Sequence, residues 1–347
     1  MTLQTKSLGR TGLPLTVLGF GGTGLGNLYA AMSERDAIAT LDAAYGAGIR
    51  YFDTAPLYGH GLSELRTGGG LRRFSDPAVK LSTKVGWRLK PAFGRPTGAG
   101  LFEQITAFSR FNDYSYDGVM RSFEDSLNRL GTDRVDVLLI HDADRRNQGD
   151  RFPEAFRAAM DGAYRALLSL REQRVVRAIG CGLNEWESCQ EFAEAGDFDC
   201  FLLAGRYTLL HQEALRSFLP LCERRGIGII LGGPFNSGIL ATGAVKDAWF
   251  HYAPASEEIL RRVAAIDMLC RQHGIPLKAA ALQFPLHHPC VATVIPGMRS
   301  AAEVAENVAM LRTPIPQDLW RELKLAGLID DSAPTSGWQL PEGVRPV

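Results

Sequence analysis

The sequence predicts an α/β protein: a closed barrel of eight parallel strands surrounded by helices, the (β/α)8 or TIM barrel. Strand-like and helix-like stretches alternate along nearly the whole chain, an order that implies parallel strands. The strand-like stretches are short and almost continuously apolar, as expected of strands covered on both faces. A length of 347 residues suits one such barrel with insertions, so residues 1–347 are expected to form a single domain.

Eight strands and eight following helices are expected. The strands are residues 18–22, 50–52, 79–83, 135–140, 176–181, 200–203, 228–231 and 291–295. The helices, which carry apolar residues at helical spacing, are residues 34–47, 63–73, 116–130, 153–173, 185–195, 211–225, 257–273 and 301–311. Glycines at 131, 226 and 274 follow three of these helices, where a left-handed residue commonly ends a helix.

Three segments fall outside this alternation. Residues 8–13 have the composition of a turn between two short strands, which predicts an N-terminal β-hairpin that closes the barrel bottom. Residues 86–115, after the third strand, and residues 236–256, after the seventh, are long loops rich in glycine, proline and aromatic residues. Loops of this length in a compact domain are usually lids or binding loops.

Composition excludes several classes of function. The chain has 38 basic and 38 acidic residues and no long basic run, which argues against nucleic acid and anionic membranes as partners. No apolar run approaches the roughly 18 residues of a membrane span, and the first residues lack a signal-peptide core. Six cysteines without a Cys-x-x-Cys pair favour reduced, buried thiols and a cytoplasmic location. His287 and His288 have no suitably spaced partner ligands, so surface histidines and no metal are expected; an oligomer stays possible.

Four residues that bear chemistry are expected at one rim of the barrel. Asp53 follows the second strand, and Tyr58 lies five residues later in a loop with proline and glycine. Lys84 ends the third strand, and His141 ends the fourth. A single polar residue at a strand end is usually structural. Four at the carboxyl ends of parallel strands, where barrel enzymes have their active sites, favour an enzyme.

These residue types fit a proton-transfer site. A phenol has a pKa of roughly 10 and needs a nearby cation to exchange its proton near neutrality. Lys84 is expected to supply that charge to Tyr58, Asp53 to hold Lys84, and His141 to donate to a substrate oxygen. Such a set moves a proton while a cofactor moves a hydride.

The motifs that carry these residues resemble the aldo-keto reductases over residues 8–307. They are Asp53…Tyr58-Gly59…Ser63-Glu64, Ser82-Thr83-Lys84 and Leu139-Ile140-His141. Residues 113–118, 203–210 and 232–240 resemble a bacterial group that includes D-threo-aldose 1-dehydrogenase, L-fucose dehydrogenase and pyridoxal 4-dehydrogenase. The resemblance implies that Tyr58 is the catalytic acid/base, supported by Asp53, Lys84 and His141.

The resemblance also implies a nicotinamide dinucleotide extended across the barrel rim. The implied cofactor-binding residues are Gly22, Thr23, Asp53, Asn184, Gly233, Pro234, Phe235, Ser237, Pro296, Gly297, Arg299, Glu303, Glu306 and Asn307. Ala204 stands where relatives commonly have glutamine, and Gly232 where they have an aromatic residue beneath the nicotinamide. Another residue must therefore support the ring, or the ring lies differently.

The adenosine end favours NAD, with NADP possible. NADPH-preferring relatives often have lysine at the position of Gly297 and arginine at that of Glu303. The Glu303 carboxylate would repel a 2′-phosphate but accept from a 2′-hydroxyl, whereas Arg299 argues for the phosphate. Residues 19–24 also match Gly-x-Gly-x-x-Gly, but no helix pattern follows directly, so a Rossmann turn is not expected.

The leading hypothesis for the reaction is oxidation of an aldose hemiacetal at C1 to its lactone, with L-fucose, D-arabinose or L-galactose as substrate. Alternatives are oxidation of pyridoxal to 4-pyridoxolactone, general NADPH-dependent carbonyl reduction, and a cofactor-sensing channel subunit without turnover. The residues expected to line the substrate pocket are Phe20, Tyr58, Trp87, His141, Trp249 and Trp338.

Overall fold

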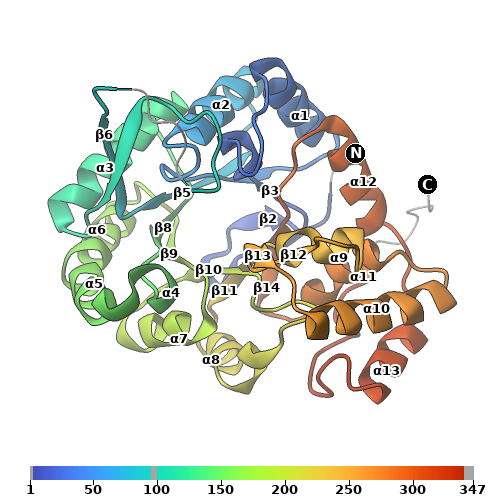
Figure 1. Ribbon diagram of the computed structural model, residues 1–347. Coiled ribbons are helices and arrows are strands. Elements are labelled where there is room, and N and C mark those ends of the chain that lie inside the picture. Colours follow the sequence, from blue (N-terminus) through green and yellow to red (C-terminus); the bar gives the residue numbers. More distant parts are fainter. Residues whose placement is uncertain (1–2, 95–99, 340–347) are drawn as a thin grey trace.

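The computed structural model describes residues 3–94 and 100–339, and its centre is an eight-stranded parallel barrel (Figure 1). The strands are β3 (Phe20–Gly21), β4 (Tyr51–Asp53), β5 (Lys80–Val85), β8 (Val137–His141), β9 (Ala178–Leu183), β10 (Cys200–Ala204), β11 (Gly228–Gly232) and β14 (Val291–Ile295). The first and last strands are joined by hydrogen bonds from Gly19 N to Val294 O (2.9 Å) and from Gly21 N to Pro296 O (3.0 Å). The predicted (β/α)8 fold is confirmed.

The N-terminal hairpin closes the bottom of the barrel, as predicted. Strand β1 (Thr5–Ser7) pairs antiparallel with β2 (Pro14–Thr16). Leu8, Leu13 and Leu15 of this hairpin are fully buried and join the side chains that fill the barrel interior. The loop between the strands is fixed by a hydrogen bond from Arg10 N to Gly226 O of 2.8 Å. Because one end of the barrel is blocked, a ligand has access from the other end only.

The helices form a ring around the barrel (Figure 1). They include α1 (Glu34–Gly46), α2 (Leu62–Leu71), α3 (Tyr116–Leu130), α7 (Trp186–Ala195), α8 (Phe218–Arg225), α10 (Glu257–Gln272) and α12 (Ala301–Leu311). Ser33, Ser115, Ser256 and Ser300 begin four of the helices by accepting a hydrogen bond from the backbone N–H three residues on. Each such cap stabilises the start of its helix by about 1 kcal/mol, which favours serine at these positions.

Two predicted helices differ in the structure. The helix expected over 153–173 consists of α5 (Phe152–Ala158), a π-helical segment (Ala159–Tyr164) and α6 (Arg165–Glu172), and the short α4 (Arg145–Gln148) precedes it. The π segment contains Gly162, where a Cβ would lie only 2.4 Å from Tyr114 O, so the helix packs directly on another backbone there. The helix expected over 211–225 begins only at α8, after a 3-10 turn over Glu213–Arg216. The helices α11 (Leu277–Gln283) and α13 (Gln317–Leu325) were not predicted.

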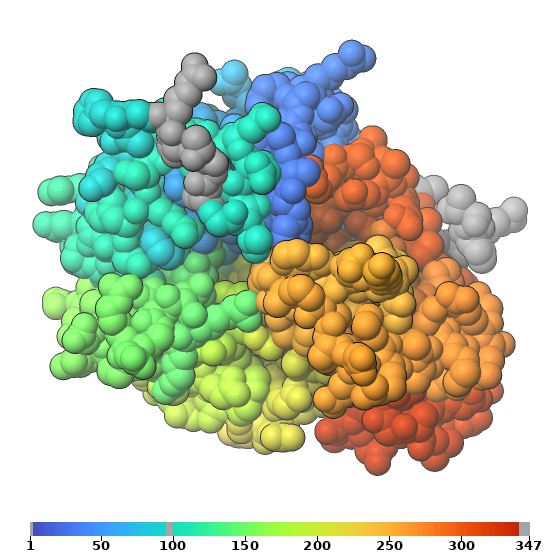
Figure 2. Space-filling model, in the orientation of Figure 1, coloured from blue at the N-terminus to red at the C-terminus, as the bar shows by residue number. Residues whose placement is uncertain are grey.

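The two long loops contain secondary structure of their own and flank the mouth of the barrel. Strands β6 (Trp87–Pro91) and β7 (Phe108–Asn112) form an antiparallel ribbon after β5. The helix α9 (Ile239–Thr242) and the small hairpin of β12 (Trp249–Phe250) and β13 (Ala253–Pro254) follow β11. In Figure 2 the teal and orange segments that contain these insertions approach each other across the same face. Both insertions therefore contribute to the walls of any site at the mouth.

Several expectations about single residues are tested by the fold. All six cysteines are unpaired and buried, as predicted. His287 and His288 are buried, so the expectation of surface histidines is wrong: His287 Nδ1 accepts from Trp338 N at 3.0 Å, and His288 packs edge-on against Tyr207. Across residues 3–94 and 100–339, no helix combines the length and the hydropathy of a membrane span. The same residues contain no cluster of three or more metal-binding side chains.

Candidate active site

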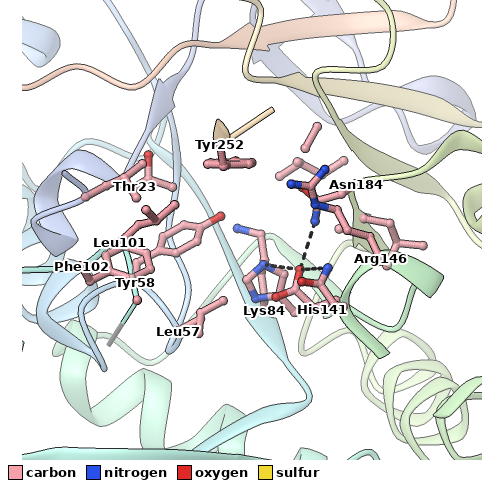
Figure 3. A pocket seen from close by; sticks show the side chains of 18 of the residues that line it. Thr23, Leu57, Tyr58, Lys84, Leu101, Phe102, His141, Arg146, Asn184 and Tyr252 are labelled. Carbon is pink, nitrogen blue, oxygen red and sulfur yellow. Dashed lines mark hydrogen bonds and ion pairs between the residues drawn. The ribbon is translucent and has the colours of Figure 1, made fainter. Parts of the chain in front are cut away.

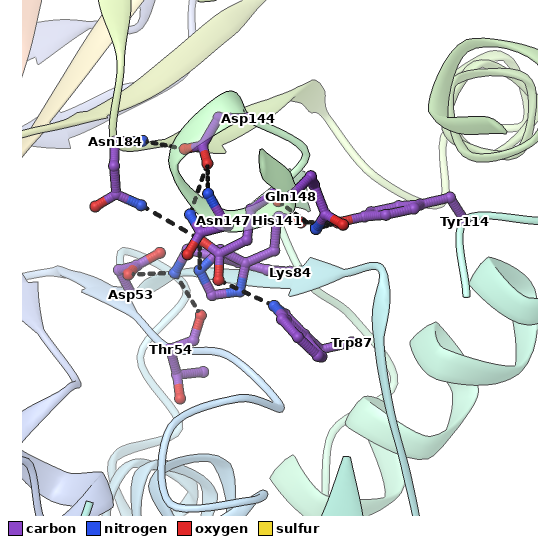
Figure 4. Close-up of polar contacts among 11 residues, drawn as sticks. Asp53, Thr54, Lys84, Trp87, Tyr114, His141, Asp144, Asn147, Gln148 and Asn184 are labelled. Atoms are coloured by element: carbon purple, nitrogen blue, oxygen red, sulfur yellow. Dashed lines mark hydrogen bonds and ion pairs between the residues drawn. The ribbon is translucent and has the colours of Figure 1, made fainter. Parts of the chain in front are cut away.

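A buried ion pair joins two neighbouring barrel strands. Strands β4 and β5 are in register with Asp53 opposite Ser82, which brings Lys84 Nζ to 2.7 Å from Asp53 Oδ2. Lys84 also donates to Thr54 O at 2.9 Å (Figure 4). Ser82 Oγ donates to Asp53 Oδ1 at 2.7 Å. Burial lowers the pKa of Lys84 and raises the pKa of Asp53. A buried pair of this kind persists only when further hydrogen bonds satisfy both charges, as they do here.

Tyr58 and His141 complete the predicted group of four. The Nζ atom of Lys84 lies 4.6 Å from the centroid of the Tyr58 ring. The His141 ring meets Tyr58 edge-on, with centroids 5.7 Å apart and an interplanar angle of 84°. Figure 3 shows all three side chains directed into one cavity. The structure thus places Asp53, Tyr58, Lys84 and His141 together at the carboxyl ends of the strands, where the sequence predicted them.

The loop that carries Tyr58 is fixed from below by the start of α2. Ser63 Oγ donates to Gly22 O at 2.7 Å and lies 2.8 Å from Thr54 Oγ1. The fully buried Glu64 accepts from Thr83 Oγ1 and from Arg129 Nε, each at 2.6 Å. Ser63 and Glu64, which belong to the same motif as Asp53 and Tyr58, therefore hold the loop that carries Tyr58 in place. They do not line the cavity into which Tyr58 points.

The expectation that Lys84 brings the Tyr58 pKa towards neutrality is not supported in the ligand-free protein. Burial raises the pKa of Tyr58 well above its usual value, and the charges of Asp53 and Asp142 raise it further. The ammonium does not offset this because Asp53 already neutralises it at 2.7 Å. The free protein consequently holds Tyr58 as a neutral phenol at neutral pH.

His141 is a neutral imidazole. Burial, followed by the charges of Lys84 and Arg110, lowers the pKa of His141 well below its usual value. Its Nδ1 is buried without a hydrogen-bond partner, and the residue lines the cavity. Nε2 lies 3.6 Å from Asp142 Oδ1. A carboxylate oxygen at that position favours the tautomer with its hydrogen on Nε2, which can donate to a ligand.

Two adjoining cavities meet above Tyr58. The first, of about 300 Å³, is bounded by Tyr58, Lys84 and His141, by Leu28, Leu57, Leu101 and Phe102 on one side, and by Arg110, Asp142, Arg146, Asn147 and Asn184 on the other. The second, of about 330 Å³, runs from Asp53 and Tyr58 along the ends of β11 and β14 to Arg299 and Glu303. Six residues line both cavities: Thr23, Leu28, Tyr58, Leu202, Ala204 and Tyr252. The two cavities form one cleft, in which the first cavity is the reaction chamber and the second is the long arm.

Most of the residues expected to bind a cofactor line the long arm. They are Thr23, Asp53, Gly233, Pro234, Phe235, Ser237, Pro296, Gly297, Arg299 and Glu303. Gly22 does not line it: Gly22 N donates to Asp53 O at 2.8 Å, and a Cβ there would lie 2.4 Å from that oxygen, so this glycine permits close strand packing. Asn184 faces the reaction chamber instead, Glu306 is paired with Lys278, and Asn307 is buried with Oδ1 unpartnered.

The long arm has the features that an extended dinucleotide needs. Gly232, Ala204 and Leu202 line it, and a Cβ at position 232 would lie 3.1 Å from Leu202 Cδ2, so a larger residue there would crowd Leu202. Tyr252 lies across the cleft as an aromatic wall. At the far end, Arg299 Nε is buried without a hydrogen-bond partner, a cation available to an anionic group. These residues fit a nicotinamide dinucleotide.

Four aromatic residues expected in the substrate pocket lie elsewhere. Phe20 is buried against Phe52, with ring centroids 5.7 Å apart. Trp87 lies behind the chamber, where its Nε1 donates to Asp142 Oδ2 at 2.9 Å. Trp249 lines a separate surface cavity and is 41% exposed. Trp338 donates through Nε1 to the side-chain oxygen of Gln283, Oε1. Its ring lies beside Lys6 of the N-terminal hairpin, at the closed end of the barrel. None of the four lines either cavity of the cleft.

The sequence reasoning missed the polar wall of the chamber. Asp142 directly follows His141, so its position after a barrel strand was a usable signal. Asn147 and Arg146 lie on α4, whose formation was not predicted. Tyr252 is at the tip of the β12–β13 hairpin with a φ of 63°, and no sequence pattern indicates that this turn reaches the cleft.

Comparisons with known proteins show the family of this chain. Residues 17–326 match the model of the aldo/keto reductase family. Pyridoxal 4-dehydrogenase of Microbacterium luteolum is 42% identical over 337 residues, covering 94% of this chain and 98% of that protein. D-Threo-aldose 1-dehydrogenase of Pseudomonas sp. is 38% identical, covering 95% and 99%.

Solved structures show the same fold. A glycerol dehydrogenase of Gluconobacter oxydans superposes with a TM-score of 0.74 at 20% identity, covering 98% of this chain and all of that one. The holo form of an aldo-keto reductase of Bacillus halodurans gives a TM-score of 0.71 at 23% identity, with coverage of 97% and 100%. With the family match spanning residues 17–326, this chain belongs to the aldo/keto reductases and is an NAD(P)-dependent oxidoreductase.

Proposed function

We propose that this protein oxidises a cyclic hemiacetal to its lactone with NAD. The arrangement that carries the proposal is the grouping of Tyr58, neutral His141 and the Lys84–Asp53 pair at the junction of the two cavities. In this reaction the anomeric carbon loses a hydride and its hydroxyl loses a proton. His141 Nε2–H holds the reacting oxygen, and Tyr58 takes the proton.

The residues of the long arm would hold the dinucleotide, with its nicotinamide end towards Tyr58 and its adenosine end towards Arg299 and Glu303. When bound, NAD supplies a hydride acceptor and a positive charge beside the phenol, which favours loss of the phenol proton. Asn184, which donates through Nδ2 to Asp142 at 3.3 Å, remains our candidate for the carboxamide through its free side-chain oxygen.

Pyridoxal is the hemiacetal that the chamber favours. Its wall of Leu28, Leu57, Leu101 and Phe102 is apolar, and Phe102 stacks against Tyr58 with centroids 6.2 Å apart. A flat aromatic ring fits against such a wall, while the polar groups opposite suit hydroxyls. The similarity to pyridoxal 4-dehydrogenase, 42% against 38% for the aldose enzyme, also supports this choice. Aldoses such as L-fucose, D-arabinose and L-galactose are the second candidates because they react at the same kind of carbon.

A substrate panel tests the proposal. Pyridoxal and the three aldoses are offered with NAD and with NADP, and absorbance of the reduced nicotinamide is followed. We expect turnover of pyridoxal or an aldose with NAD to exceed turnover with NADP. Faster reduction of simple aldehydes with NADPH than oxidation of any hemiacetal would support the general carbonyl reductase instead.

The preference for NAD is attributed to Glu303. Its Oε2 accepts from Arg299 N at 2.9 Å, and the carboxylate lines the end of the long arm. The change Glu303→Gln keeps an acceptor for that N–H but removes the charge, so NADP is expected to gain about tenfold in affinity relative to NAD. Fluorescence titration of both dinucleotides measures this ratio. An unchanged ratio would show that Glu303 does not select the cofactor.

Tyr252 is expected to hold the nicotinamide end in place of the absent aromatic residue at 232. Its N–H donates to Ser237 Oγ at 3.0 Å, which ties the hairpin to the loop after β11. The change Tyr252→Ala is expected to weaken NAD binding about tenfold, and Tyr252→Phe to leave it within about threefold, because a stacking contact needs the ring and not the hydroxyl. Equal losses in both variants, measured by the same titration, would argue against stacking.

A further inference from the structure

One buried carboxylate in the reaction chamber has no part in the proposed proton transfer. Asp142 follows His141 in a left-handed backbone conformation (φ 54°), which aspartate tolerates better than most residues. It is 6% exposed and lines the chamber with Tyr58 and His141. A buried carboxylate is costly unless donors surround it, so its partners indicate its purpose.

Among the described residues, the side chains that hydrogen-bond the Asp142 carboxylate are all donors, and they come from three different strand-end loops. Trp87 Nε1 donates to Oδ2 at 2.9 Å, and the side-chain amides of Asn147 and Asn184 donate to Oδ1 at 3.2 and 3.3 Å (Figure 4). The Asn147 amide nitrogen also donates to Asp144 Oδ1 at 2.6 Å. Lying between two carboxylates, this amide can present only its nitrogen to Asp142.

The donors leave one acceptor position open. A carboxylate accepts about four hydrogen bonds, and the described residues supply three, since His141 Nε2 at 3.6 Å is too distant for a fourth. Burial and the charge of Asp144 raise the pKa of Asp142 to about 7, so the carboxylate form that accepts hydrogen bonds predominates at the pH 8 of the test below. Because Asp142 lines the chamber, a ligand hydroxyl is positioned to supply the fourth.

The distance between Asp142 and His141 indicates which hydroxyl of a substrate would bind to Asp142. Asp142 Oδ1 lies 3.6 Å from His141 Nε2, the atom that donates to the reacting oxygen in the proposed reaction. Two oxygens in a 1,2- or 1,3-relationship on a ring lie a comparable distance apart. One of them accepts from His141 while the other donates to Asp142, so the pair of groups complements a diol.

We propose that Asp142 is a specificity-determining residue that binds a second substrate hydroxyl, next to the one that is oxidised. This assignment rests on the proposed function. In pyridoxal the group is the phenolic 3-hydroxyl, and in an aldose it is the 2-hydroxyl. The chemistry is the same in both, and the two arms of the test distinguish them.

The test compares each substrate with its analogue lacking that hydroxyl: pyridoxal with 3-deoxypyridoxal, and L-fucose with 2-deoxy-L-fucose, at pH 8 with NAD. For the pair that the enzyme uses, kcat/KM is expected to fall about 10- to 100-fold on removal of the hydroxyl, as for a hydrogen bond to a charged group. In Asp142→Asn and Asp142→Ala the ratio of kcat/KM for the parent substrate to kcat/KM for its deoxy analogue is expected to fall to within about threefold of one. The main cause is a lower kcat/KM for the parent substrate.

Trp87→Phe is the matched control. It removes one donor to Asp142 but keeps the carboxylate, so the ratio should stay near that of the wild-type protein. If Asp142 only holds the three loops together, Trp87→Phe and Asp142→Asn will instead lower kcat/KM equally for both substrates of a pair, and the assignment fails. A wild-type ratio near one also overturns it, whether or not the variants fold. Absence of oxidation of either parent hemiacetal would overturn the proposed function, and this assignment with it.

Discussion

Replacing Tyr58 with phenylalanine is expected to lower kcat for hemiacetal oxidation by about 10²- to 10⁴-fold, the usual contribution of a positioned acid/base. The ring remains, so its contacts with Phe102 and the edge of His141 are kept. Binding of NAD should change by less than about threefold, because in the described part of the chain the Tyr58 hydroxyl makes no hydrogen bond that supports the walls of the long arm. Steady-state kinetics and cofactor titration measure the two effects. Wild-type rates in Tyr58→Phe would mean that another group transfers the proton.

The raised pKa of Tyr58 predicts how the rate depends on pH. Burial holds the pKa of the phenol above its usual value, so at neutral pH the protonated form dominates. Oxidation requires the phenolate, whose fraction rises tenfold per pH unit below the pKa, and log kcat/KM should rise with pH until that pKa is reached. Reduction uses the phenol and should stay level over the same range. The rise should vanish in Tyr58→Phe.

Replacing Lys84 with methionine is expected to lower both activity and stability strongly. The change leaves Asp53 buried without its cation, and breaking one partner of a buried pair costs about 3–5 kcal/mol of unfolding free energy. Denaturant unfolding followed by circular dichroism measures this cost. Lys80→Met is a matched control on the same strand, since Lys80 Nζ contacts only backbone oxygens, of Pro77 and Val79, at the other end. It should cost clearly less.

The double variant Asp53→Asn with Lys84→Met separates stability from catalysis. Removing both charges relieves the unpaired carboxylate, so much of the lost stability should return. Activity should not return, because the double variant lacks the N–H donor that lies 4.6 Å from the Tyr58 ring and can hydrogen-bond the phenolate oxygen formed during oxidation. Recovery of activity along with stability would show that Lys84 acts only as a structural partner of Asp53.

The barrel and the grouping of the four candidate catalytic residues could be predicted because their signals are local. Each strand of a parallel barrel is a short apolar run, and its carboxyl end is known from chain direction alone, so Asp53, Lys84 and His141 were placed correctly. Glycines after helix ends marked the boundaries of several helices, as at Gly131 and Gly226. Local chemistry of this kind does not depend on distant contacts.

The rest of the site depends on contacts that the sequence does not encode locally. The aromatic residues of the long loops were all equal candidates in the sequence, yet only packing decides that Tyr252 enters the cleft while Trp249 faces outwards. The pairing of Lys84 with Asp53 was expected from the sequence, and the two atoms lie 2.7 Å apart. The burial that raises the pKa of Tyr58 depends on packing around the ring and could not be predicted from the sequence.

The measurement that tests the central claim most directly is identification of the product formed with NAD. Incubation of the protein with pyridoxal or L-fucose and NAD, followed by mass spectrometry and absorbance of NADH, is expected to give one lactone for each NADH. Tyr58→Phe should give neither. Formation of an alcohol from an aldehyde with NADPH, and no lactone from any hemiacetal with NAD, would contradict the account.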